Sequence, residues 1–169
     1  MALGLAGVAM VLGLAGIAMA APADDLREAQ KLYGEGKLPD ALDKVEVVLK
    51  ADPRDAQARF LKGLVLADEK RTPEAIEVFM GLTEEFPEMP EPYNNLAVLY
   101  AAQGQHERAR TVLEVAIATH PGYAIAHENL GDIHALLARQ AYERAAKLDK
   151  TNTTAALKMA KVLEALRIR

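Results

Sequence analysis

Cysteine is absent from the 169 residues, and aromatic residues make up only 5% of them. Without cysteine the chain can form no disulfide, thiol nucleophile, CxxC redox pair or cysteine-ligated zinc site. It also lacks the lipid-bearing cysteine that a bacterial lipoprotein needs. Few aromatic residues within a 51% hydrophobic composition indicate packed Ala/Leu-rich helices rather than sheets. The formal net charge of −4 provides no basic surface for phosphates, so nucleic-acid binding is disfavoured.

The first 20 residues contain no charged side chain, and the first charges are Asp24 and Asp25. This apolar run ends in Ala-Met-Ala, which is typical of a secretory signal peptide and predicts a periplasmic protein cleaved after Ala20, with Ala23 as the second choice. However, no lysine or arginine precedes the run, and about 20 apolar residues suffice to span a bilayer. The alternative is therefore an uncleaved inner-membrane anchor with the rest of the chain facing the periplasm. Only in that case is the membrane a partner.

The rest of the sequence repeats with a period of 34 residues, which separates Pro53, Pro87 and Pro121. Three further sets keep the same register. Twelve residues before each proline lies alanine: Ala41, Ala75 and Ala109. Twenty-four residues before lies a small residue: Ala29, Gly63 and Ala97. Eight residues before lies a large apolar residue: Val45, Phe79 and Leu113. Small residues allow paired amphipathic helices to approach closely, and proline ends the second helix of a pair. The period therefore predicts stacked helix pairs that share a core.

The segment from Tyr93 to Tyr100, YNNLAVLY, followed by Gly104 and Ala109, resembles the tetratricopeptide repeat family. The resemblance extends from residue 22 to about residue 150, with repeats at about 22–53, 56–87, 90–121 and 124–150. It implies an all-α, right-handed α-solenoid of antiparallel helix pairs. We expect helices at about 23–34, 39–50, 54–69, 73–85, 91–103 and 106–119, with Thr72 capping the fourth.

The fourth repeat departs from this pattern because eight residues separate His134 from Tyr142, where 13 are expected. The glycine turn between the two helices is missing, and the only remaining glycine is Gly131 at the helix-packing position. The sequence therefore predicts one continuous helix over about 123–148. Thr151-Asn152 then predicts the start of a last helix, so that residues 151–169 form a C-terminal capping helix.

The family resemblance also implies a binding surface, because the first helices of successive repeats line a concave groove that holds an extended peptide. The residues carried over to this groove are Gln57, Phe60, Leu61, Leu64, Asn94, Asn95, Val98, Glu128, Asn129 and Asp132. Corresponding positions are occupied by Leu26, Arg27, Gln30, Tyr33, Ala67, Asp68, Glu91, Ala101, Ala102 and Ile125. In peptide-binding members an asparagine at the position of Asn95 and Asn129 pairs with the ligand main chain. The alternative is that both are consensus residues on a solvated wall. Acidic and apolar groove residues favour an apolar or basic segment.

No catalytic motif is present, and we expect neither an enzyme nor a cofactor. His127 and His134 lie seven residues apart but fall on packing positions, so core histidines are expected rather than metal ligands. His106 and His120 lie at helix ends, where capping explains them. The sequence thus predicts a protein–protein interaction scaffold in the bacterial cell envelope. The alternatives are a membrane-anchored structural subunit or assembly factor of an envelope complex, and a homodimer also stays open.

Overall fold

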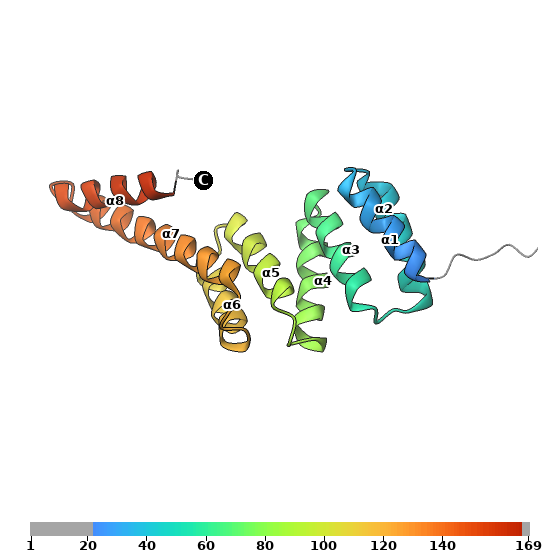
Figure 1. Cartoon of the computed structure of the whole chain (residues 1–169). Coiled ribbons are helices and arrows are strands. Elements are labelled where there is room, and N and C mark those ends of the chain that lie inside the picture. The colour runs from blue at the N-terminus through green and yellow to red at the C-terminus, as the bar shows by residue number, and fades with distance from the viewer. Residues whose placement is uncertain (1–21, 167–169) are drawn as a thin grey trace, which may run out of the picture.

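A computed structural model describes residues 22–166 of the chain. The predicted signal segment, residues 1–20, lies outside the described residues, as does the very end of the last predicted helix. The described part is all-α, as expected (Figure 1). It consists of eight helices: α1 (Pro22–Gly34), α2 (Leu38–Ala51), α3 (Ala56–Asp68), α4 (Thr72–Glu85), α5 (Pro90–Ala102), α6 (His106–Thr119), α7 (Ala124–Leu148) and α8 (Thr153–Ala165). The first seven lie within two residues of their predicted spans, and α8 begins two residues after the predicted start of the last helix.

The helices pack as a row of pairs. Each helix contacts the next in sequence, and the first helices of neighbouring units also touch, α1 with α3 and α5 with α7. Figure 1 shows α1 and α2 at one end of the row and the long helix α7 with α8 at the other. This stacking is the expected helical solenoid, in which each pair buries its apolar face against its neighbours.

The core is built from the positions that define the repeat. Ala41, Ala75 and Ala109 are all fully buried. The large residue eight positions before each proline is buried as well, and Phe79 is fully enclosed between α3 and α4. Because side chains at one repeat position meet the same helix interface in each pair, a period of 34 residues in the sequence becomes a continuous core in space.

Gly36 and Gly104 lie in turns between paired helices and have φ angles of 73° and 74°, a conformation that glycine adopts without strain. The start of α4 differs from the prediction. Arg71 precedes the helix, Thr72 is its first residue and no side chain caps it. Thr72 cannot act as the cap because it already has helical geometry. At the start of α8 the cap is confirmed, because Asn152 Oδ1 accepts a hydrogen bond from the Ala155 amide at 2.9 Å.

The fourth unit contains the predicted continuous helix, α7, which is 25 residues long. Helix α8 folds back along the outer part of α7 (Figure 1). No second helix of the repeat type therefore returns over the beginning of α7. As a result Gly131 is exposed, and a Cβ built on it would meet no atom within 4 Å. Its predicted role as a packing residue is wrong.

The predictions for His127, His134 and His106 are wrong, whereas His120 lies at the C-terminal cap position of α6, as expected. His127 and His134 are exposed instead of buried, since α7 is covered on fewer sides than α5. His106 is not a cap. It is 7% exposed, and its Nδ1 lies 2.8 Å from Nε2 of Gln140, so the outer half of α7 covers the start of α6.

Within residues 22–166, no helix is both long and apolar enough to span a membrane.

Candidate functional site

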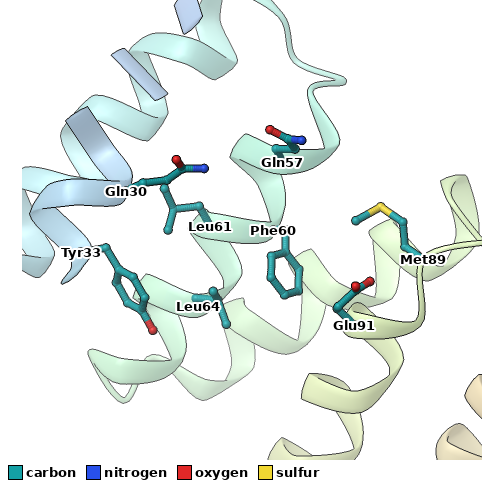
Figure 2. Close-up of a pocket in the computed structure, with 8 residues that line it drawn as sticks. All are labelled: Gln30, Tyr33, Gln57, Phe60, Leu61, Leu64, Met89 and Glu91. Carbon is teal, nitrogen blue, oxygen red and sulfur yellow. The ribbon is translucent and has the colours of Figure 1, made fainter. Parts of the chain in front are cut away.

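The concave side of the solenoid contains a hollow of about 430 Å³ between α1, α3 and the start of α5, which we call the first hollow. Figure 2 shows the side chains that line it, contributed by three successive first helices and the loop before α5. They are Gln30, Tyr33, Gln57, Phe60, Leu61, Leu64, Met89 and Glu91. Four of the predicted groove residues, Gln57, Phe60, Leu61 and Leu64, thus lie together around one hollow.

The floor of the first hollow is apolar and is held in place by the core beneath it. The Phe60 ring lies 5.7 Å from the ring of Phe79 at an interplanar angle of 58°, a tilted aromatic packing. Phe79 is fully buried, and Leu61 is only 5% exposed. Because these contacts fix the floor, the hollow is formed before any ligand arrives and can accept an apolar side chain without repacking.

Tyr33 forms one wall of the first hollow and joins two repeats. Its hydroxyl donates a hydrogen bond to Asp68 Oδ2 at 2.8 Å. Burial, followed by this hydrogen bond and the negative charge of Asp68, raises the pKa of Tyr33 to about 12. The phenol therefore stays neutral at physiological pH, its proton is committed to Asp68, and its ring lines the hollow (Figure 2).

A second hollow of about 130 Å³ lies between α5 and α7, with Leu113 of α6 beneath it. Its lining comprises Ala97, Val98, Ala101, Leu113, Asn129, Asp132, Ile133 and Leu136. Three predicted groove residues, Val98, Asn129 and Asp132, are among them, and Val98 is 49% exposed. The predicted residues are thus divided between two hollows on the same face.

The remaining predicted residues, Asn94, Asn95 and Glu128, line neither hollow. Asn94 joins the second hollow indirectly, because Asn129 Nδ2 donates a hydrogen bond to Asn94 Oδ1 at 2.7 Å. Asn95 Nδ2 donates to the Glu91 carbonyl at 2.9 Å, within α5. Each asparagine keeps further donor or acceptor capacity, since an amide offers two N–H groups and two lone pairs. The pair from Asn94 to Asn129 can therefore bind a peptide group while it links α5 to α7.

The charged side chains that line the two hollows are all acidic. No lysine or arginine lines either hollow, whereas Glu91 lines the first and Asp132 the second. Glu91 and the exposed Glu128 form no ion pair with any residue in the described range 22–166. Such carboxylates attract cationic side chains and repel acidic ones, and because both are exposed, salt screens this effect. In the same range, no three histidine, aspartate or glutamate side chains are placed to hold a metal ion.

Sequence reasoning missed Met89 in the first hollow and the hydrogen bond that joins Asn94 to Asn129. Met89 lies in the loop between repeats, outside the groove positions of the helices. The two asparagines are 35 residues apart, one more than the repeat period, so they meet across the gap between neighbouring helices. In the sequence, this separation of 35 residues is the one feature that could have indicated the contact between the two asparagines.

Comparison with solved structures shows the fold. The chain is similar to TTC0263, a thermophilic TPR protein of Thermus thermophilus, at 24% identity and a TM-score of 0.66, covering 87% of this chain and 84% of that one. It is also similar to the first TPR of Spaghetti (RPAP3) bound to the HSP90 peptide SRMEEVD. The identity is 18% and the TM-score 0.64, and the match covers 73% of this chain and 99% of that one. YrrB, a TPR protein with an unusual peptide-binding site, is 26% identical with a TM-score of 0.62, covering 66% and 58%.

No curated protein sequence matches the chain. Two tetratricopeptide repeat family models do, one over residues 26–90 and the other over residues 66–132. Together they extend over three helix pairs and the start of α7, the segment in which the 34-residue period was found. With the solenoid and its buried repeat positions, these matches establish that the chain belongs to the tetratricopeptide repeat family.

Proposed function

We propose that the protein is a non-catalytic scaffold that binds an extended segment of another protein along its concave face. The observation that supports this best is the pair of hollows on that face, lined by apolar side chains and two carboxylates with no lysine or arginine. An extended chain can place one apolar side chain in the first hollow and lay its main chain against the asparagines between the hollows. Tetratricopeptide repeat proteins are generally interaction modules of this kind, not enzymes.

The ligand is a segment that combines apolar and basic side chains. Phe60 and Leu64 provide apolar contact area in the first hollow, and Glu91 at its edge accepts a cationic group (Figure 2). The HSP90 peptide SRMEEVD bound by the first TPR of RPAP3 carries three acidic residues. In the groove described here such a peptide would meet the carboxylates of Glu91 and Glu128, which form no ion pair within residues 22–166, so it is expected to bind poorly.

A peptide array tests this charge preference and the position of the site. The purified full-length chain is applied to immobilised heptapeptides that combine apolar residues with lysine or arginine. The comparison set consists of SRMEEVD and of acidic heptapeptides with the same apolar residues as the basic ones. We expect retention on the apolar–basic peptides only, weakening as salt is added. Phe60→Ala should reduce this retention by at least about tenfold, as expected for a central aromatic contact.

The matched control is Val115→Ala, which truncates an apolar residue that is 40% exposed on α6, outside both hollows. It should leave retention unchanged, with circular dichroism showing that both variants keep the wild-type helical content. Equal losses in the two variants, or preferential retention on acidic peptides, would place the binding surface elsewhere.

We propose that this scaffold works in the bacterial cell envelope, on the periplasmic side. The support is the apolar, uncharged segment 1–20 with its Ala-Met-Ala ending. The alternative is a membrane-anchored structural subunit that retains this segment and docks an envelope complex. Mass spectrometry of the protein from its native host separates the two, because a cleaved chain begins at or near residue 21 and an anchored one keeps residues 1–20.

A further inference from the structure

Charge is distributed very unevenly along the chain. Residues 22–133 contain 12 lysines and arginines against 21 acidic residues, whereas residues 134–166 contain six against three. The acidic part is the solenoid with its groove. The basic part is the outer half of α7 together with α8, which we call the C-terminal hairpin (residues 134–166 of the described structure). Two surfaces of opposite sign therefore lie in one molecule.

Most basic side chains of the C-terminal hairpin form no ion pair, in contrast to those of the solenoid. Nine of the 12 lysines and arginines before residue 134 form ion pairs. In the hairpin only Arg139 forms one, with Glu143. The other five are exposed and have no ion-pair partner among residues 22–166: Arg144, Lys147, Lys150, Lys158 and Lys161. Their charge is therefore available to a partner.

The tip of the hairpin presents an apolar side chain between two of these bases. Leu148, the last residue of α7, is 83% exposed and lies between Lys147 and Lys150 in the sequence. The one acid at this tip, Asp149, is occupied: its Oδ1 accepts hydrogen bonds from the backbone and the hydroxyl of Thr151. The tip thus combines the two properties, apolar and basic, that the concave groove favours in its ligand.

The first hollow offers the complementary surface. Its floor is apolar, and Glu91 lies at its edge (Figure 2). Glu88 is exposed and precedes Met89 in the loop before α5, beside the residues that line the hollow. Glu88 and Glu91 form no ion pair within the described part of the chain. At about 430 Å³ this hollow is also the larger of the two on the concave face. It can hold a leucine side chain with one lysine at Glu91 and a second lysine near the loop that contains Glu88.

We propose that the C-terminal hairpin of one copy of this chain docks into the concave groove of a second copy, with Leu148 in the first hollow and Lys147 and Lys150 facing Glu88 and Glu91. This rests on the proposed function of the groove and names its occupant. Within one molecule the hairpin cannot reach the hollow, because α8 packs against α7 at the opposite end of the row from α1 (Figure 1). The contact is head to tail, so it extends into a series of copies.

Sedimentation equilibrium of the purified full-length chain tests the proposal. The weight-average mass should rise with concentration above the 18.3 kDa of one chain, and this association should weaken when salt is raised from about 50 mM to about 500 mM. The hairpin variant Lys147→Glu/Lys150→Glu and the groove variant Glu88→Lys/Glu91→Lys should each stay monomeric. Mixed together they should associate again, because each altered surface then meets a complementary one.

The control variant, Lys50→Glu/Lys70→Glu, makes the same change in net charge at two exposed solenoid lysines without ion pairs, and it should associate like the wild type. A monomeric wild type, or association unchanged in the hairpin and groove variants, overturns the proposal. The proposal is also overturned if the wild type is monomeric and floats with phosphatidylglycerol vesicles while the hairpin variant does not. That result would assign the hairpin to a membrane surface. If the wild type is monomeric yet retains apolar–basic peptides through Phe60, the proposed function stands and only this inference fails.

Discussion

Gly63 lies so close to Phe79 that a Cβ built on the glycine would be 2.6 Å from Cε1 of the ring. Phe79 is fully buried and has no free space to move into. Gly63→Ala should therefore lower the free energy of unfolding by about 1–3 kcal/mol through overpacking, although alanine is the better helix former. Chemical denaturation monitored by circular dichroism measures the difference.

Gly131→Ala is the matched control, because Gly131 occupies the same repeat position in the fourth unit. It is exposed, and no atom lies within 4 Å of a Cβ built there. Here the helix propensity of alanine is unopposed, and the substitution should raise the free energy of unfolding by about 0.5–1 kcal/mol. Destabilisation of similar size at both glycines would show that a helix covers Gly131.

These two glycines also show how far the sequence predicts the fold. The period identifies the helices, their pairing and the buried alanines, because those depend on local pattern and on the neighbouring repeat. It also predicts the continuous α7, from the missing turn. It does not predict that Gly131, His127 and His134 are exposed, because their burial depends on a second helix that the same missing turn removes. A repeat position predicts burial only where the partner helix of that repeat exists.

The continuity of α7 predicts a long distance between Glu128 and Lys147, which are 19 residues apart and both exposed. At a rise of about 1.5 Å per residue, their Cα atoms are separated by about 28 Å along one helix. Spin labels on Glu128→Cys/Lys147→Cys measure this by electron–electron double resonance, and the absence of native cysteine makes the labelling specific. A much shorter distance would mean that the fourth unit folds back as a helical hairpin instead.

Tyr33 predicts how stability depends on pH in the alkaline range. Its pKa is raised in the folded protein from the ordinary 10.0 to about 12, chiefly by burial and then by Asp68. Because the folded state holds the proton more tightly, the stabilisation is complete below about pH 10 and is lost as the pH rises towards 12. Tyr33→Phe keeps the ring but cannot ionise. The wild type should lose stability relative to Tyr33→Phe over this interval.

Absorbance of tyrosinate provides an independent measurement of the same pKa. The chain has five tyrosines, and the last of them to ionise in the wild type should be missing from the titration of Tyr33→Phe. If the two titrations differ instead near pH 10, Tyr33 is neither buried nor hydrogen-bonded to Asp68 in solution.

The candidate site is predicted from the sequence less completely than the fold. The helix register places Phe60, Leu64 and Val98 on the concave face, because side-chain direction follows from position in a regular helix. It does not place Met89, which lies in a loop, or the Asn94–Asn129 hydrogen bond, which depends on the distance between two helices. These parts of the groove depend on how neighbouring repeats stack in space, which the 34-residue period of the sequence does not define.

That hydrogen bond leads to the last prediction. Asn129→Ala leaves the Asn94 amide without its partner and should lower the free energy of unfolding by about 0.5–1.5 kcal/mol, the usual net value of one neutral hydrogen bond. It also removes an amide from the groove, so retention on the apolar–basic peptides should fall about tenfold. Gln103→Ala, whose exposed side chain accepts a hydrogen bond from Gln105 in the turn after α5, should lower stability by a similar amount at most and leave retention unchanged. If Asn129→Ala lowers stability while retention is unchanged, the asparagine pair only joins α5 to α7, and the ligand main chain is bound elsewhere on the concave face.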